Sequence, residues 1–178
     1  MRRVNLRIYP FSIQFRVVRT FGIVHSMPKR QAIQPAECLE CGNARPLLGN
    51  CMHCGSESTP HAVRECFILN LEIGAPTAED ALDRLTQHVR GASEVGIRTM
   101  IVIHGYGSSG SGGKIKWAVR DALENNYFSD RVDEYYFGED VAFASSGYHA
   151  LLRRRPSLKE HLAPFKVGNA GMTVLLMR

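Results

Sequence analysis

Four cysteines in two closely spaced pairs are the residues of this sequence that point most directly to a chemistry. Cys38 and Cys41 form the first pair, nine residues follow, and Cys51 and Cys54 form the second pair. A Cys-x-x-Cys turn brings two thiolates onto one metal ion, and two such turns complete a tetrahedral site. Because four protein ligands leave no open position for a substrate, we expect a structural Zn²⁺ here.

The residues around these pairs support a metal site rather than disulfides. Gly42 and Gly55 each follow the second cysteine of a pair, where glycine relieves the positive-φ crowding of the turn. The fifth cysteine, Cys66, lies alone in an apolar stretch and is expected to be a buried side chain.

The sequence shows no secretory signal and no apolar run of the roughly 20 residues that span a membrane. We therefore expect a cytoplasmic protein with no membrane partner.

A glycine-rich segment from His104 to Lys114 is a second candidate site. It joins an expected buried strand to an expected helix, where free N–H groups and the positive dipole end favour an anion, usually phosphate. A flexible glycine/serine linker is the alternative. The candidate phosphate- or nucleic-acid-binding residues are Gly105, Tyr106, Gly107, Gly110, Gly112, Gly113, Lys114, Lys116 and Arg120.

Two known phosphate-binding patterns can be compared with this segment. The P-loop pattern is excluded, because Ser108 occupies the position of its first glycine and Ile115, not Ser or Thr, follows the lysine. The stretch Gly105–Gly110 does fit the dinucleotide pattern, with Asp133 as the acidic residue further along. A nucleotide or dinucleotide binder is therefore one alternative function.

The elements that position these residues alternate between strands and helices. This alternation predicts an α/β fold of order β-α-β-α-β-β, a two-layer sandwich preceded by a small zinc ribbon. The predicted strands cover residues 66–73, 99–103, 132–137 and 172–177, and the predicted helices start after the N-cap Thr77 and at Lys114.

The length and charge distribution suggest how the chain is divided. The 178 residues fit one ordinary domain plus a metal-held module. The net charge of +5 has its basic surplus at the two ends, so the pI of 9.1 is weak evidence for nucleic acid. The predicted divisions are a poorly ordered N-terminal extension and linker at 1–37, a zinc ribbon at 38–61, and an α/β domain at 66–178 with an insert at about 144–166.

The strand, His-Gly-x-Gly, glycine-rich loop and helix at Val102–Ile115 resemble the small MutS-related (Smr) domain. The resemblance covers residues 66–178 and includes Asn169–Leu176, which looks like the family's glycine-rich last strand. Smr domains resemble the C-terminal domain of bacterial translation initiation factor three and bind nucleic acid, and several members nick DNA or cleave RNA. The resemblance therefore implies DNA or RNA as partner. It leaves open an endonuclease on RNA or branched DNA, or a non-catalytic binding or interaction module.

The opening strand departs from that family. Smr domains usually open with Leu-Asp-x-His-Gly, whereas Asn70 stands here in place of the acid and Glu72 in place of the histidine. An asparagine cannot act as a general base, whereas Glu72 can, and it could partner His104. The resemblance thus implies Glu72 and His104 as catalytic candidates, and leaves open a divalent metal for cleavage.

We also expect specific roles or placements for Tyr106, for Trp117 and for the run of three arginines. Tyr106, at the loop tip, is a candidate to stack on a base. Trp117 lies beside the apolar stripe of its helix and is expected in the core. The run Arg153–Arg155 is either a phosphate-binding insert or an ordinary solvated run.

Overall fold

The computed structural model describes residues 36–106, 113–162 and 167–178. The expected disorder of the N-terminal extension falls almost wholly on residues outside this range, and so do Gly107, Gly110 and Gly112 of the glycine-rich segment.

The cysteine module is built on three very short strands. β1 (Ala36–Glu37) lies between β2 (Ala44–Arg45) and β3 (His61–Ala62) in an antiparallel sheet. Arg45 is only 2% exposed, and its guanidinium donates to the carbonyls of Ser58 and Gly49. These two hydrogen bonds connect the loops that contain Ser58 and Gly49, in a segment that has little apolar core of its own.

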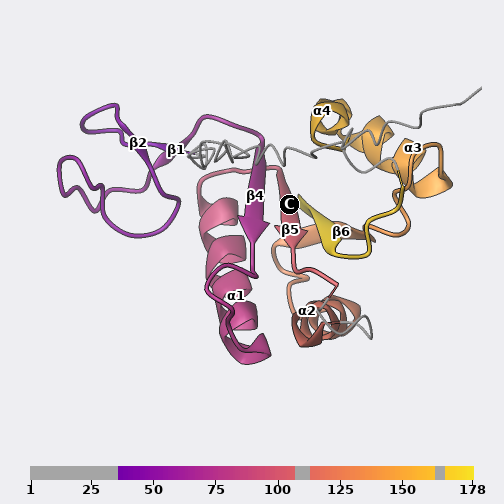
Figure 1. Cartoon of the computed structure of the whole chain (residues 1–178). Coiled ribbons are helices and arrows are strands. Elements are labelled where there is room, and N and C mark those ends of the chain that lie inside the picture. Colours follow the sequence, from indigo (N-terminus) through magenta and orange to yellow (C-terminus); the bar gives the residue numbers. More distant parts are fainter. Residues whose placement is uncertain (1–35, 107–112, 163–166) are drawn as a thin grey trace, which may run out of the picture. The chain divides into compact units, whose positions relative to one another are not determined.

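The main sheet has the strand order β4-β5-β7-β6 (Figure 1). β4 (Cys66–Asn70) runs parallel to β5 (Thr99–Ile103), while β7 (Met172–Met177) is antiparallel both to β5 and to β6 (Val132–Phe137). Ile103 pairs with Met172, and Phe137 with Thr173. The carboxyl ends of β4, β5 and β6 therefore meet the start of β7 at one edge of the sheet.

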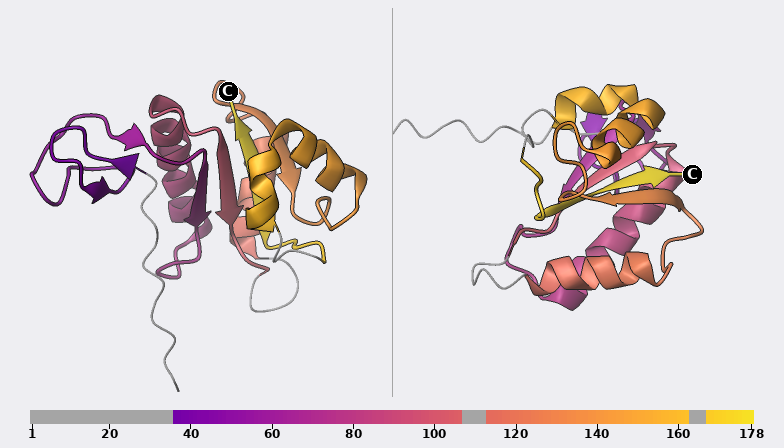
Figure 2. Two further views of the ribbon diagram at one scale, coloured as in Figure 1. Left: turned by 90° about the horizontal axis from the view of Figure 1, so that it is seen from above. Right: turned by 90° about the vertical axis from the view of Figure 1, so that its right-hand side faces the viewer.

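Two helices cover one face of this sheet (Figure 2). α1 (Ala78–Glu94) begins at the predicted N-cap Thr77, which forms a capping box with Asp80. α2 (Lys114–Glu124) turns Val119, Ala122 and Leu123 inward. The shared core contains Leu85 and Val89 of α1, these α2 residues, and sheet residues Leu69, Met100, Val102 and Leu175.

The predicted insert folds onto the opposite face. It forms α3 (Ser146–Arg154), a 3-10 turn η1 (Pro156–Leu158) and α4 (Lys159–Leu162). Their apolar residues Tyr148, Leu151, Leu158 and Leu162 pack against Ile101, Val174 and Leu176. The predicted α/β class and element order are confirmed, and the insert extends the sandwich by a third layer. α3 was not predicted, because it gains its stability from the sheet face that it covers.

A leucine of the cysteine module belongs to the core of the main sheet. Leu47 is 6% exposed and lies in the same cluster as Leu85 and Val89. At Gly91 of α1 an added Cβ would come within 2.6 Å of Leu48 Cδ2, so a glycine lets these leucines approach the helix. The module therefore contributes apolar contacts to the domain that follows it.

Candidate functional site

The four cysteines form a cluster that can hold a metal ion. Their sulfur atoms all lie within 4.8 Å of one another. Cys38 Sγ is 3.7 Å from Cys54 Sγ, and Cys41 Sγ is 3.7 Å from Cys51 Sγ. A disulfide needs a separation of about 2.05 Å, so all four cysteines are free thiols. The two predicted pairs therefore converge on one cluster.

Both turns are made in the same way. The Gly42 N–H donates to the Cys38 carbonyl, and the Gly55 N–H donates to the Cys51 carbonyl, each at 2.8 Å. The φ angles of these glycines are +68° and +72°, in the region that other residues rarely adopt. The Cys41 N–H favours the thiolate and lowers the pKa of Cys38 to about 6. The pKa of Cys54 is instead raised to about 12, because the backbone N–H of Ser56, which lowers it, is outweighed by the neighbouring cysteine side chains and by burial.

His104 follows β5 at the sheet edge and lies inside the protein. It is 3% exposed, and Nε2 is 2.9 Å from the Thr173 hydroxyl, while Nδ1 is 3.4 Å from the Gly105 carbonyl. Burial is the main cause that lowers the His104 pKa, against the opposing effect of the Gly105 carbonyl. The ring is therefore held neutral and in one orientation.

Glu72 lies beside Gly105 and has no hydrogen bond to the His104 imidazole among the described residues. Its N–H donates to the Asn70 carboxamide at 2.9 Å, so Asn70 shapes the turn after β4. The exposed Glu72 carboxylate lies against Gly105, where an added Cβ would overlap it. Gly105 has φ +69°. The edge thus brings Glu72 next to Gly105, whereas His104 is paired with Thr173.

The two ends of the glycine-rich segment are well placed for a ligand. The N–H groups of His104 and Gly105 both donate to the Gly171 carbonyl at 2.9 Å, which fixes the exit from β5. Tyr106 is 53% exposed, and its ring lies against Gly171. At the other end, Gly113 is the N-cap of α2 and supplies no capping side chain, and Lys114 beside it is exposed.

Two of the predicted phosphate contacts are already occupied by a carboxylate. Glu139, which follows β6, accepts from Arg120 Nη1 at 2.7 Å and lies 3.6 Å from Lys116 Nζ. The Arg120 guanidinium also lies over the Phe137 ring at 3.8 Å and pairs with Glu124. Partial burial opposes ionisation of Glu139, but its own backbone N–H and Arg120 hold its pKa below the usual range. Lys114 is therefore the more available cation at this edge.

Several expectations from the sequence need correction. Trp117 is 56% exposed rather than in the core. Asp133, the acidic residue of the dinucleotide pattern, lies at the opposite edge of the sheet and pairs with Arg154 at 2.7 Å. Arg154 also pairs with Glu134, so the arginine run is partly neutralised. These placements remove the support for a dinucleotide site.

Three contributors to the edge were not predicted from the sequence. Thr173 holds His104, Glu139 holds Arg120, and the Asn169 carboxamide accepts from the Gly171 N–H at 3.0 Å. Thr173 and Glu139 are distant in sequence from the residues that they hold, whereas Asn169 is only two residues from Gly171. Only the resemblance of the last strand pointed toward the region of Asn169 and Thr173.

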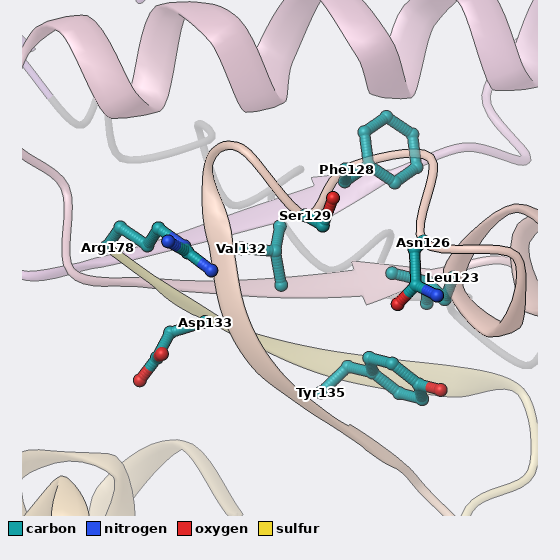
Figure 3. Close-up of a pocket in the computed structure, with 8 residues that line it drawn as sticks. All are labelled: Leu123, Asn126, Phe128, Ser129, Val132, Asp133, Tyr135 and Arg178. Carbon is teal, nitrogen blue, oxygen red and sulfur yellow. The ribbon is translucent and has the colours of Figure 1, made fainter.

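A small cavity of about 150 Å³ lies away from this edge (Figure 3). It is formed where α2 ends and β6 begins, between Phe128, Tyr135 and Arg178. Apart from Asp133, the acidic residue of the dinucleotide pattern, none of the predicted site residues lines it. The cavity therefore adds nothing to the chemistry of the sheet edge.

The cysteine module presents a negative surface. Within residues 36–61, Arg45 is the only lysine or arginine, and it is buried. Glu37, Glu40 and Glu57 are exposed. Residues 36–61 therefore offer no exposed lysine or arginine to a phosphate backbone.

Comparisons with known proteins identify the region around the sheet edge. A model of the Smr domain family matches residues 72–142. Among solved structures, the crystal structure of the Smr domain of Thermus thermophilus MutS2 is similar at 22% identity and a TM-score of 0.38, covering 62% of this chain and 96% of that chain. No curated protein sequence matches. None of the described helices has the length and apolar content of a membrane span.

Proposed function

The chain contains an Smr domain at residues 72–142, and on that premise we propose that it binds nucleic acid where β5 ends and α2 begins. Smr domains are a family associated with nucleic-acid binding and nuclease activity. The match includes His104, Gly105 and Lys114, which lie at this edge. This match is the observation that carries the proposal.

The contrast between the two helix starts supports the same location. α1 begins with a capping box and with Glu79 and Asp80, which complement its dipole. α2 begins with an uncapped glycine and has no acid in its first turn, where Lys114 and Lys116 stand instead. Lysines at a helix start disfavour the helix but attract a phosphate.

A salt-dependent binding measurement tests this proposal. We would titrate fluorescently labelled single-stranded and hairpin RNA and DNA with the full chain at several salt concentrations. We expect Lys114→Gln to weaken binding to all of them and to reduce the slope of log K against log salt by about 1. The matched control is Lys159→Gln, an exposed lysine on the opposite face of the sheet. Equal effects of the two variants, or no binding at low salt, would refute the proposal.

We also propose that the metal of the cysteine cluster is Zn²⁺. A tetrahedral site with Zn–S bonds of about 2.3 Å places its sulfurs about 3.8 Å apart. Two of the sulfur–sulfur separations in the structure are 3.7 Å, and all lie within 4.8 Å. With four ligands the ion would be structural. We expect the purified protein to contain one zinc per chain and Cys38→Ser to lose it. Iron in its place, or no metal in freshly prepared protein, would contradict this assignment.

Cleavage of the bound nucleic acid is a second candidate function, favoured by the position of Glu72. Its exposed carboxylate lies against Gly105, within the edge proposed to bind phosphate, where it could act as a general base toward water. His104 would serve as a positioning residue, because its ring is buried against Thr173. Its neutral ring would keep the Gly105 backbone in place.

Cleavage is tested by a variant that preserves shape. We would incubate metal-defined protein with labelled structured RNA and branched DNA, alone and with added divalent cations. We expect Glu72→Gln to abolish cutting while binding persists. Identical cutting by both proteins would assign the activity to a contaminant. If the wild-type protein binds without cutting under all conditions, the non-catalytic binding module is correct.

A further inference from the structure

Trp117 is the side chain whose placement the fold does not explain. It is the only tryptophan of the chain and is 56% exposed. The core face of α2 is formed by Val119, Ala122 and Leu123, and Trp117 lies about 200° around the helix from Val119. Its indole is thus displayed on the outer face of the first turn.

The surroundings of Trp117 are charged rather than apolar. Lys114 lies one turn before it on the same face and is exposed, and Lys116 Nζ is 5.9 Å from the centroid of the indole. Asp121 and Glu124, which follow on that face, are also exposed. A protein partner would require a wider apolar surface around the indole. Lys116 also pairs with Glu139, so Lys114 is the more available cation beside the ring. An isolated ring beside such a lysine instead fits a ligand with both a flat apolar face and a negative charge.

A second exposed aromatic stands at the other end of the same connection. Tyr106 is 53% exposed, and its ring is supported by the Gly171 backbone, where a Cβ would come within 3.1 Å of the ring. Tyr106 thus precedes the glycine-rich segment, and Trp117 lies in the first turn of the helix that follows it. Aromatic rings beside cations form the usual platform for single-stranded nucleic acid.

We propose that Trp117, together with Tyr106, stacks on unpaired bases, so that the ligand of this edge is single-stranded or locally unpaired nucleic acid. The inference rests on the nucleic-acid binding proposed above and adds the substrate class. Paired bases within a duplex hide their faces in the stack, so an exposed indole gains nothing from them. Lys114 would contact the backbone of the same strand.

The single tryptophan makes the test direct. We would titrate the full chain with a labelled oligouridylate of about 12 nucleotides and with an RNA duplex of equal length, at low salt. Anisotropy of the label reports binding, and Trp117 fluorescence reports stacking. We expect the single strand to quench Trp117 in proportion to binding and the duplex to leave its fluorescence unchanged.

Variants separate this inference from the proposal on which it rests. We expect Trp117→Ala to weaken single-strand binding about tenfold, Trp117→Phe to retain most of it, and Tyr106→Ala to weaken it as well. Because Trp117 is exposed, the thermal midpoint of its variants should be unchanged. Binding without quenching, with equal affinity for Trp117→Ala, would overturn the stacking inference and leave the proposed function standing. Equal quenching by the duplex would overturn the assignment to unpaired bases. Absence of any nucleic-acid binding would overturn both.

Discussion

At the residue scale, the hydrogen bond between His104 and Thr173 makes the His104 ring a structural part of the sheet edge. The imidazole is buried, and both ring nitrogens have partners within the protein. A histidine that reacts with a substrate needs a ring nitrogen that the substrate can reach. The exposed Glu72 carboxylate is better placed for such a role. His104 instead fixes the backbone from which Gly105 and Tyr106 extend.

The first expectation concerns Thr173. Thr173→Val should lower the free energy of unfolding by about 1–3 kcal/mol, because it leaves a nitrogen of the buried His104 ring without a partner. Thr59→Val, at an exposed position, is the matched control and should change stability by less than about 0.5 kcal/mol. Urea unfolding followed by circular dichroism measures both. Equal stability of the two variants would show that the His104–Thr173 bond is unimportant.

The same burial makes stability depend on pH. Burial is the main cause that lowers the pKa of both His104 and His88, so the unfolded chain binds protons that the folded protein excludes. Stability should be complete above the ordinary histidine pKa of about 6.5 and fall as the pH drops below it. Urea unfolding between pH of about 7.5 and 5.5 measures this. His104→Gln and His88→Gln should each flatten the dependence, and a wild-type protein equally stable throughout would contradict the account.

At the element scale, the start of α2 lacks the capping side chain and the acidic residues that stabilise the start of α1. The strands and helices could be predicted because their signals are local, such as the N-cap residue Thr77 and the apolar run at Thr99–Ile103. The ion pairs of Lys116 and Arg120 with Glu139 could not be predicted, because Glu139 reaches these side chains only once β6 lies beside α2. The exposure of Trp117 was mispredicted because an aromatic near an apolar stripe usually turns inward.

A change of charge at Lys114 in α2 should therefore have opposite effects on the stability of the protein and on its binding of nucleic acid. Lys114→Glu complements the dipole of α2 and should raise the free energy of unfolding by about 0.3–1 kcal/mol. The same change should weaken nucleic-acid binding, because it replaces an attractive charge at the proposed site with a repulsive one. Thermal unfolding and anisotropy titration measure the two effects. A variant that loses both stability and affinity would indicate a structural role for Lys114.

At the scale of the whole molecule, the cysteine module acts as a support for the domain that follows it. Its four sulfurs converge, its only arginine is buried, and Leu47 enters the core with Leu85 and Val89. The cysteine spacing predicted the cluster, but nothing local in the sequence separated Leu47 from the exposed Leu39. That distinction depends on which leucine meets α1.

Two leucines of the module provide a matched test of this role. Leu47→Ala should cost about 2–5 kcal/mol, as for other buried leucines, because it removes side-chain atoms from the core. Leu39→Ala, at a position 68% exposed, should cost less than about 0.5 kcal/mol. Urea unfolding of the metal-loaded chain measures both. Equal small costs would show that the module folds without supporting the domain.

The most direct measurement of the central claim is the location of the nucleic-acid contact on the protein. We would record amide NMR spectra of the full, metal-loaded chain during titration with a short single-stranded oligonucleotide. We expect the largest shifts at Gly105, Tyr106, Gly113, Lys114 and Trp117, with small shifts in the cysteine module at residues 36–61. Shifts concentrated in that module or around Arg153–Arg155, with the β5–α2 edge unchanged, would contradict the account.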